Sequence, residues 1–216
     1  MAQRTKMRVK KARFESEQKA SILNAAVRVF GEKGYKGATI RSLGRAAKVN
    51  SALLYYYYEN KHNLFTESIR MIIQGLLDRF SRPHPPFTGP RDRLTYLVET
   101  IFDYYTEHPE RMRLMAIVLT LHSRVLIVTL SGFVRSKAVL PFAVIQEGMQ
   151  KGEFKQAHPI QAWWSIIGVC MFSLLSQNVI PQVASKLANL PPFNASNRKT
   201  QIVDLLMNGI AISPNT

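Results

Sequence analysis

The chain has 216 residues, and 46% of them are hydrophobic, which is enough to bury a core and excludes a disordered chain. Its formal net charge of +15 indicates a polyanionic partner, with an anionic membrane as the competing interpretation. Residues 1–62 hold 14 basic and 4 acidic side chains, whereas residues 63–216 hold 15 and 10, so the polyanion site is predicted to be N-terminal.

Cellular location is the next property that composition bears on. Cys170 is the only cysteine, so no intrachain disulfide can form and a reducing compartment is expected. The basic, polar stretch from Met1 to Phe14 does not resemble a secretory signal or an anchor. Ala162 to Leu175 is nearly all apolar but shorter than the ~20 residues of a membrane span. We therefore expect a cytoplasmic protein in which this run is a buried or dimer-interface helix.

The chain begins with a basic segment, residues 1–15, that we predict to be a flexible arm. It has little to pack and six cations: Arg4, Lys6, Arg8, Lys10, Lys11 and Arg13. A compact domain is predicted over residues 16–62. Apolar residues from Ile22 to Phe30 recur at helical spacing, and Gly34 supplies a stop. Short helices follow at 40–47 and 51 to about 58, and a long helix runs to Phe80. Polar N-caps precede these three helices: Thr39, Asn50 and Asn60.

Residues 63–216 are predicted to form a larger helical domain. Four prolines between Ser81 and Pro90 end the long helix in a loop. Further helices are expected at about 91–107, 109–121, 124–150, 157–179 and 195–212. Pro141 should kink or split the third of these. Val125 to Leu130 has the β-branched content of a short strand, but no stretch shows sustained alternation. The fold class is therefore all-α.

Two short helices joined by a three-residue turn have the layout of a helix-turn-helix. Leu54 and Tyr58 lie one turn apart and should pack inward. Four successive tyrosines could form an aromatic core cluster, but four successive helical positions cannot all face inward. The outer face should carry Ser51, Ala52, Tyr55 and Tyr56. Small residues let a helix approach base edges, and tyrosine hydroxyls reach phosphates or bases. The helix starts at Thr39 and Asn50 favour phosphate, and Lys61 is a further candidate contact.

The segment from Ile22 to Ile69 resembles the tetracycline repressor (TetR) family. The resemblance rests on the order of Phe30, Gly34, Thr39, Ile40, Leu43, Ala46, Ala47, Val49, Leu54, Tyr55, Tyr57, Lys61 and Leu64. It implies DNA contacts at Thr39, Ser51, Ala52, Tyr55, Tyr56 and Lys61, and a guanine-reading position at Arg41. Three residues depart from the family pattern, with Lys48 and Ala52 at usual glycines and Gly44 at a usual alanine. A left-handed turn at Lys48 would carry strain.

The C-terminal half resembles the family only in helix number, helix length and its closing apolar pattern. The resemblance implies a homodimer through the last two helices. Helices around an apolar cavity indicate a sensor pocket, and aromatic and thioether side chains with few acids suggest a small hydrophobic or aromatic effector. The candidate pocket residues are aromatic, histidine and methionine side chains: Phe102, Tyr104, Tyr105, His108, Met115, His122, Trp163, Trp164 and Met171. Each of them is also a candidate for ordinary core packing.

The remaining chemistry in the sequence is sparse. Five scattered histidines form no metal-binding motif, and no phosphate loop, nucleophile elbow or paired-carboxylate motif occurs, so no metal, cofactor or enzymatic activity is predicted. The predicted function is a repressor that a small effector releases from a palindromic operator. Two alternatives stay open, a non-specific DNA-coating protein and a helical enzyme or peptide-binding adaptor with an incidental basic face.

Overall fold

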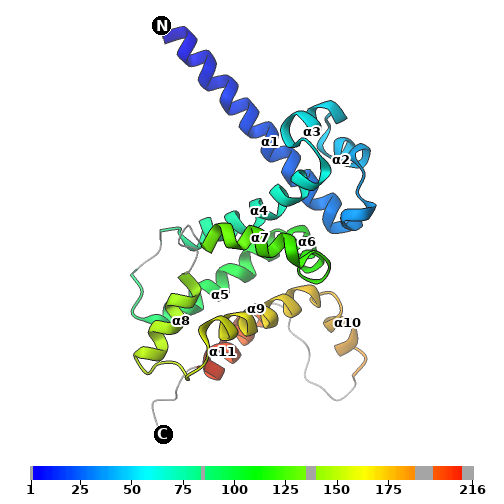
Figure 1. The fold of residues 1–216 in the computed structure, drawn as a ribbon. Coiled ribbons are helices and arrows are strands. Elements are labelled where there is room, and N and C mark those ends of the chain that lie inside the picture. The colour runs from blue at the N-terminus through cyan, green and yellow to red at the C-terminus, as the bar shows by residue number, and fades with distance from the viewer. Residues whose placement is uncertain (1, 84–85, 135–139, 188–196, 211–216) are drawn as a thin grey trace. The chain divides into compact units, whose positions relative to one another are not determined.

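The structure is a computed structural model that describes residues 2–83, 86–134, 140–187 and 197–210 (Figure 1). Every regular element in these ranges is a helix, which confirms the all-α class; the possible strand at Val125 to Leu130 is helical. In chain order the helices are α1 (Ala2–Gly37), α2 (Ile40–Ala47), α3 (Ser51–Tyr58), α4 (Lys61–Phe80), α5 (Pro90–Glu107), α6 (Pro109–Leu121), α7 (Ser123–Val134), α8 (Leu140–Gln150), α9 (Pro159–Leu175), α10 (Ile180–Ala184) and α11 (Arg198–Ile210).

The helices form two compact units. The first comprises Met1–Gln74 and Arg113–Thr129, and the second comprises Gly75–Met112 and Leu130–Thr216. The division therefore falls inside α4, beyond the boundary expected after residue 62. The first unit also takes in the corner between α6 and α7, which lies far from α1–α4 in the sequence.

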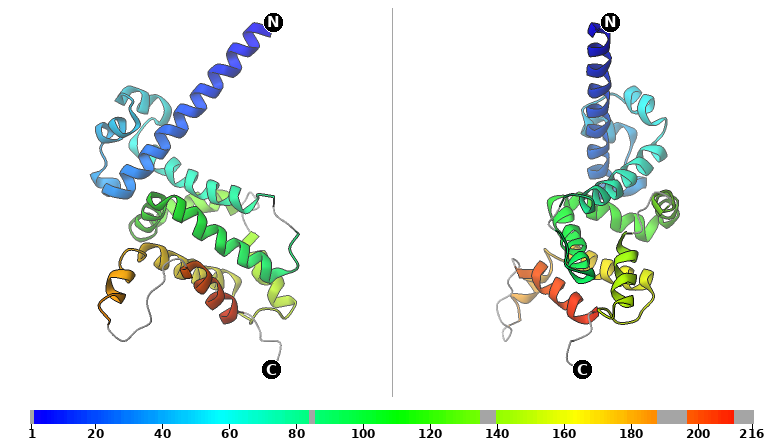
Figure 2. Two further views of the ribbon diagram at one scale, coloured as in Figure 1. Left: turned by 180° about the vertical axis from the view of Figure 1, so that it is seen from behind. Right: turned by 90° about the vertical axis from the view of Figure 1, so that its left-hand side faces the viewer.

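Helix α1 begins well before the expected position. It runs from Ala2 into the first predicted helix, so the segment expected to be a flexible arm is helical. Residues 2–30 contain no glycine or proline and are rich in alanine, lysine and arginine, which are good helix formers. Figures 1 and 2 show this N-terminal half running clear of α2 and α3. Gly34, with φ of 65°, interrupts the helix close to its predicted end.

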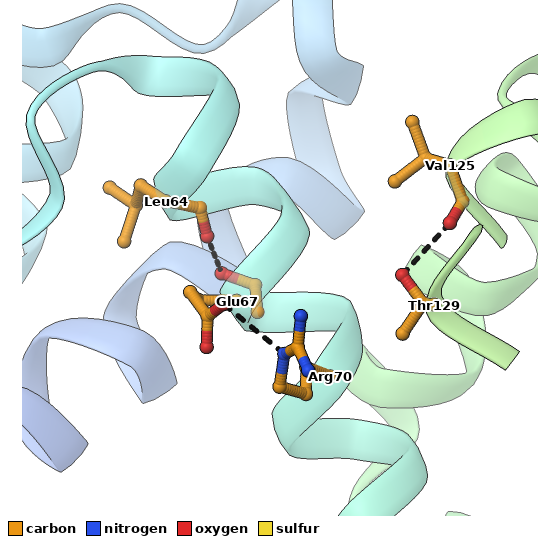
Figure 3. Close-up of polar contacts among 6 residues, drawn as sticks. Leu64, Glu67, Arg70, Val125 and Thr129 are labelled. Atoms are coloured by element: carbon orange, nitrogen blue, oxygen red, sulfur yellow. Dashed lines mark hydrogen bonds and ion pairs between the residues drawn. The ribbon is translucent and has the colours of Figure 1, made fainter. Parts of the chain in front are cut away.

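The core of the first unit joins α1, α2, α3 and α4. Its fully buried apolar side chains include Ile22, Phe30, Leu43, Leu54, Leu64, Phe65 and Ile69. The rings of Phe30 and Phe65 pack edge to face with centroids 5.0 Å apart. Two buried hydroxyls stay satisfied within their own helices: Ser68 donates to the Leu64 carbonyl at 2.7 Å, and Thr129 donates to the Val125 carbonyl at 2.8 Å (Figure 3).

The second unit is built around α5, which packs against α8, α9 and α11. Its buried side chains include Leu94, Leu97, Ile101, Tyr104, Ile145, Phe154, Ile166, Cys170 and Met207. Exposed or half-exposed ion pairs reinforce the helix contacts. Arg93 of α5 pairs with Glu147 of α8, and Lys199 of α11 lies 2.9 Å from Asp103 of α5.

The C-terminal helices follow the sequence prediction with differences at their ends. The helix expected at 124–150 is present as two helices, α7 and α8, with Pro141 in the first turn of α8 and residues 135–139 outside the described ranges. The expected start of the last helix at residue 195 and its end at 212 also lie outside them. In the part that the structure describes, no single helix meets the length and hydropathy of a membrane span; α6 and α7 meet them only as a pair bent by 110°.

Candidate nucleic-acid interface

Local hydrogen bonds determine where the two short helices begin. At the start of α2, Thr39 Oγ1 accepts from the Ser42 amide at 3.0 Å, and Ser42 Oγ accepts from the Thr39 amide at 3.0 Å. At the start of α3, Asn50 Oδ1 accepts from the Leu53 amide at 2.9 Å. Asn60 caps α4 in the same way, through the amide of Asn63. These contacts confirm the three predicted caps.

Two of the three residues that depart from the family pattern shape the turn between α2 and α3: Lys48 lies in the turn, and Gly44 lies in α2 beside it. Lys48 adopts the left-handed conformation, with φ of 57° and ψ of 39°. This is the backbone conformation in which strain was expected for a residue other than glycine. Its amide donates to the carbonyls of Gly44 and Arg45 and so closes α2. A Cβ at Gly44 would lie 2.8 Å from the Val49 carbonyl oxygen. Gly44 therefore lets the turn fold tightly against α2, which gives a structural reason for glycine there.

Helix α3 divides its tyrosines between two faces. Leu54 and Tyr58 are buried, as predicted, whereas Tyr55 is 50% and Tyr56 74% exposed. Ser51 and Ala52 are also exposed, at the beginning of the helix. The outer face of α3 thus presents two small residues followed by two tyrosine rings, a shape suited to the major groove of DNA.

The inner tyrosines attach α3 to α1. The Tyr57 hydroxyl donates to Gln18 Oε1 at 2.8 Å, and the Tyr58 hydroxyl donates to the Lys19 carbonyl at 3.1 Å. Burial, followed by the nearby Glu67 and Tyr57, raises the pKa of Tyr58 to about 12, so its hydroxyl remains a donor. The sequence contained no signal for Gln18 or Lys19, because a long-range contact between helices has no local pattern.

The other predicted DNA-contact residues differ in exposure. Thr39, Arg41 and Asn50 are exposed on the same unit as α3. The Lys61 ammonium instead donates to the carbonyl oxygens of Tyr35 and Ala38, both at 3.0 Å. An ammonium has three donors, so Lys61 has at most one left for a phosphate.

The candidate effector residues are divided between the two units. Phe102, Tyr104, Tyr105 and Trp163 are buried in the second unit, His108 and Met171 are half-buried there, and Trp164 is 44% exposed. Burial raises the pKa of Tyr104 and that of Tyr105, so both phenols stay protonated. Met115 and His122 belong to the first unit. The His122 ring contacts the rings of Phe65 and Tyr35, with centroids 5.2 and 5.7 Å apart.

Two adjoining hollows lie between α1 and the turn after α2. The larger, of about 570 Å³, is lined by residues that include Ser21, Asn24, Arg28 and Lys48, and the smaller, of about 250 Å³, lies against Phe14, Gln18 and Val49. None of the candidate effector residues lines either hollow. Within the described ranges, no three histidine, cysteine or acidic side chains gather as a metal site would require.

A capped pair of short helices with an exposed second helix has the layout of the helix-turn-helix in DNA-binding proteins. Residues 22–67 match the family described as bacterial regulatory proteins of the tetR family, and residues 90–206 match the tetracyclin repressor-like C-terminal domain. The chain therefore belongs to the TetR family of transcriptional regulators.

Individual relatives agree with this assignment. The HTH-type transcriptional repressor NicS of Pseudomonas putida is 32% identical over 158 residues, which cover 70% of this chain and 73% of NicS. Among solved structures, a TetR family transcription regulator from Marinobacter aquaeolei has a TM-score of 0.71 at 17% identity and covers 94% of this chain and 100% of its own. The fatty acid degradation regulator FadR from Bacillus halodurans has a TM-score of 0.66 at 20% identity, covering 88% and 94%. These structural likenesses concern the fold.

Proposed function

We propose that this regulator is a cytoplasmic homodimeric repressor that binds a palindromic operator through α3 and leaves it when a small molecule binds the C-terminal domain. The observation that carries the proposal is the exposed face of α3. Its side chains Ser51, Ala52, Tyr55 and Tyr56 point to solvent, while Leu54 and Tyr58 hold the helix from behind. A reading helix needs this division, because base contacts require a rigidly mounted outer face.

Surrounding groups support the docking of α3 on DNA. Exposed Thr39 and Arg41 at the start of α2, with Asn50 before α3, supply donors for phosphates, and Arg41 is suited to a bidentate contact with guanine. Lys61 serves this surface mainly by holding the start of α4 against the end of α1, because two of its donors are already engaged.

Dimerisation is supported by an apolar face on α9. Trp164, Val169, Phe172 and Leu175 are 44%, 37%, 71% and 45% exposed, and they recur at helical spacing. Gly168 lies among them with open space around it, which would let a second helix approach closely. Exposed apolar stripes of this kind mark protein interfaces. Pairing of α9 and α11 with a second copy would cover the stripe and present two α3 helices to the two halves of a palindrome.

Release by an effector requires one element common to both units. Helix α4 is continuous from Lys61 to Phe80, while the boundary between the units falls after Gln74. A ligand that shifts the second unit would therefore act on the first through a rigid connector. A hundredfold loss of operator affinity requires ~2.7 kcal/mol of differential binding, within the ordinary allosteric range. The buried aromatic residues of α5 and α9 favour a hydrophobic or aromatic effector.

The test is a selection from random DNA with the purified full chain at physiological salt. We expect one palindromic site that binds ~10³-fold more tightly than a scrambled duplex. The double variant Tyr55→Ala/Tyr56→Ala should lose most of this preference and keep the weaker binding to scrambled DNA. Tyr55→Phe/Tyr56→Phe, which keeps both rings, separates ring contacts from hydroxyl contacts.

The selection also distinguishes the alternative of a non-specific DNA-coating protein. That protein would enrich no motif, and the Tyr55→Ala/Tyr56→Ala variant would bind all duplexes almost as well as the parent chain. An enriched site whose affinity does not depend on these tyrosines would contradict the assignment of α3 as the reading helix.

A further inference from the structure

The N-terminal half of α1 carries an unusual concentration of exposed positive charge. Every side chain from Met7 to Phe14 is exposed, and four of them are cations: Arg8, Lys10, Lys11 and Arg13. No acid precedes Glu15 in the chain. Arg13 pairs with Glu17 at 2.8 Å, whereas the other three cations have no carboxylate partner among the described residues. Cations three residues apart on a helix repel one another. A polyanion at this surface would relieve this repulsion.

The four cations fall on two opposite sides of the helix. Arg8 and Lys11 follow the three- and four-residue spacing that leads to Gln18 and Lys19, so they share the side of α1 to which α3 is attached. Lys10 and Arg13 follow the spacing that leads to Glu17, on the other side. Glu15 also lies on this side, four residues after Lys11, but no ion pair joins it to either cation among the described residues. The side of α1 next to α3 therefore carries two cations and one acid.

The extension is long enough to reach DNA beyond the contact made by α3. Eleven residues separate Arg8 from Lys19, which corresponds to about 16 Å along a helix. About five phosphates of one strand lie within that length of duplex. Figures 1 and 2 show this part of α1 projecting past α2 and α3, with no other element of the first unit covering it.

A membrane surface is the competing partner for an exposed basic helix. An interfacial helix needs a continuous apolar face opposite its charged one. The exposed apolar residues here are Met7, Val9 and Phe14. Met7 and Phe14 share a side at seven-residue spacing, but Val9 lies elsewhere around the helix. These three residues form no apolar face, and the position beside α3 favours DNA.

We propose that the N-terminal extension of α1 is a second DNA-binding element, in which Arg8 and Lys11 bind backbone phosphates beside the groove that α3 enters. The inference rests on the proposed function, because it takes α3 as the reading helix. The extension adds affinity and footprint length without sequence preference, since phosphate contacts do not read bases.

The experiment compares two charge-matched double variants of the full chain, Arg8→Gln/Lys11→Gln and Lys10→Gln/Arg13→Gln. Both remove two cations from the same exposed helix, so helix content by circular dichroism and the melting temperature should match the parent chain. Binding is measured by fluorescence anisotropy across KCl concentrations, on the selected operator duplex and on a scrambled duplex of equal length.

We expect Arg8→Gln/Lys11→Gln to lower the slope of log affinity against log salt by ~1.8 per protomer, on both duplexes, because each lost phosphate contact lowers it by ~0.9. Lys10→Gln/Arg13→Gln should change the slope by less than half as much. Equal slopes for the two variants would overturn the proposal. A loss of binding only to vesicles containing phosphatidylserine, with DNA binding unchanged, would overturn it in favour of a membrane role. Failure to recover any operator would count against the proposed function alone, because the scrambled duplex still tests the extension.

Discussion

The ammonium of Lys61 lies 3.0 Å from the carbonyl oxygen of Tyr35 and 4.4 Å from the centre of the Tyr35 ring. A second hydrogen bond, to the carbonyl of Ala38, completes a contact between the start of α4 and the end of α1. Lys61 therefore connects the two helices that flank the helix-turn-helix. A cation that satisfies two carbonyls and one aromatic face has a structural role in addition to any contact with DNA.

The first prediction concerns this contact. Lys61→Met keeps much of the aliphatic stem but leaves two carbonyls without a charged donor, so we expect the free energy of unfolding to fall by about 2 kcal/mol. Urea denaturation of the full chain measures the change. Lys48→Met, at an exposed lysine of the same unit, is the control and should have a much smaller effect. If Lys61→Met kept its stability but lost operator binding, the main role of Lys61 would be to bind phosphate.

The second prediction contrasts two glycines of the second unit. A Cβ at Gly148 would lie 2.1 Å from the ring of fully buried Phe154, whereas one at Gly132 would meet nothing within 4 Å. We expect Gly148→Ala to destabilise the fold by about 2–3 kcal/mol through overpacking. Gly132→Ala, in an exposed helical position, should stabilise it by about 0.5–1 kcal/mol. Thermal unfolding of both variants checks the opposite signs, and unchanged or raised stability of Gly148→Ala would contradict the close packing of Gly148 against Phe154.

The third prediction concerns acid stability. Hydrogen bonds from Arg93 and Lys151 lower the pKa of Glu147 to about 2. A carboxyl whose pKa is lower in the folded state contributes stability above its unfolded pKa, and this contribution is lost as the pH falls towards 2. Glu147→Gln should therefore destabilise the protein at pH 6 and have little effect near pH 2. Urea midpoints at several pH values measure this, with Glu32→Gln as a control at an exposed acid. An effect of equal size at every pH would exclude the ionic explanation.

The fourth prediction concerns the proposed homodimer. Phe172 on α9 and Ile127 on α7 are similarly exposed, at 71% and 63%, but only Phe172 belongs to the apolar α9 stripe. Phe172→Glu should convert the dimer to monomers at micromolar concentration, because it places a charge in an apolar interface. Ile127→Glu should leave the dimer intact. Sedimentation equilibrium measures the oligomeric state of both variants. If Ile127→Glu gave monomers and Phe172→Glu did not, the interface would lie on α7.

Much of the helix-turn-helix was predictable because its determinants are local. The caps at Thr39, Asn50 and Asn60 involve residues three apart, and the two faces of α3 follow from helical periodicity. The same periodicity located α5, α6 and α9 to within a few residues. Sequence reasoning was less successful for residues 2–15. Their charge suggested an unstructured arm, whereas their backbone preferences favour the helix that is observed.

The direction of a long side chain and the pairing of distant helices have no local signal. Lys61 looked like a phosphate contact, and only its position against Tyr35 and Ala38 reveals its structural role. His122 was predicted to be a pocket residue, and the corner between α6 and α7 places its ring against that of Phe65, a contact that has no local signal in the sequence. The sequence by itself determined the helices, their caps and the outer face of α3, because these depend on neighbours within one or two turns. Only the tertiary structure decided which candidate side chains bond to or pack against other parts of the chain, because these contacts join segments that are far apart in the sequence.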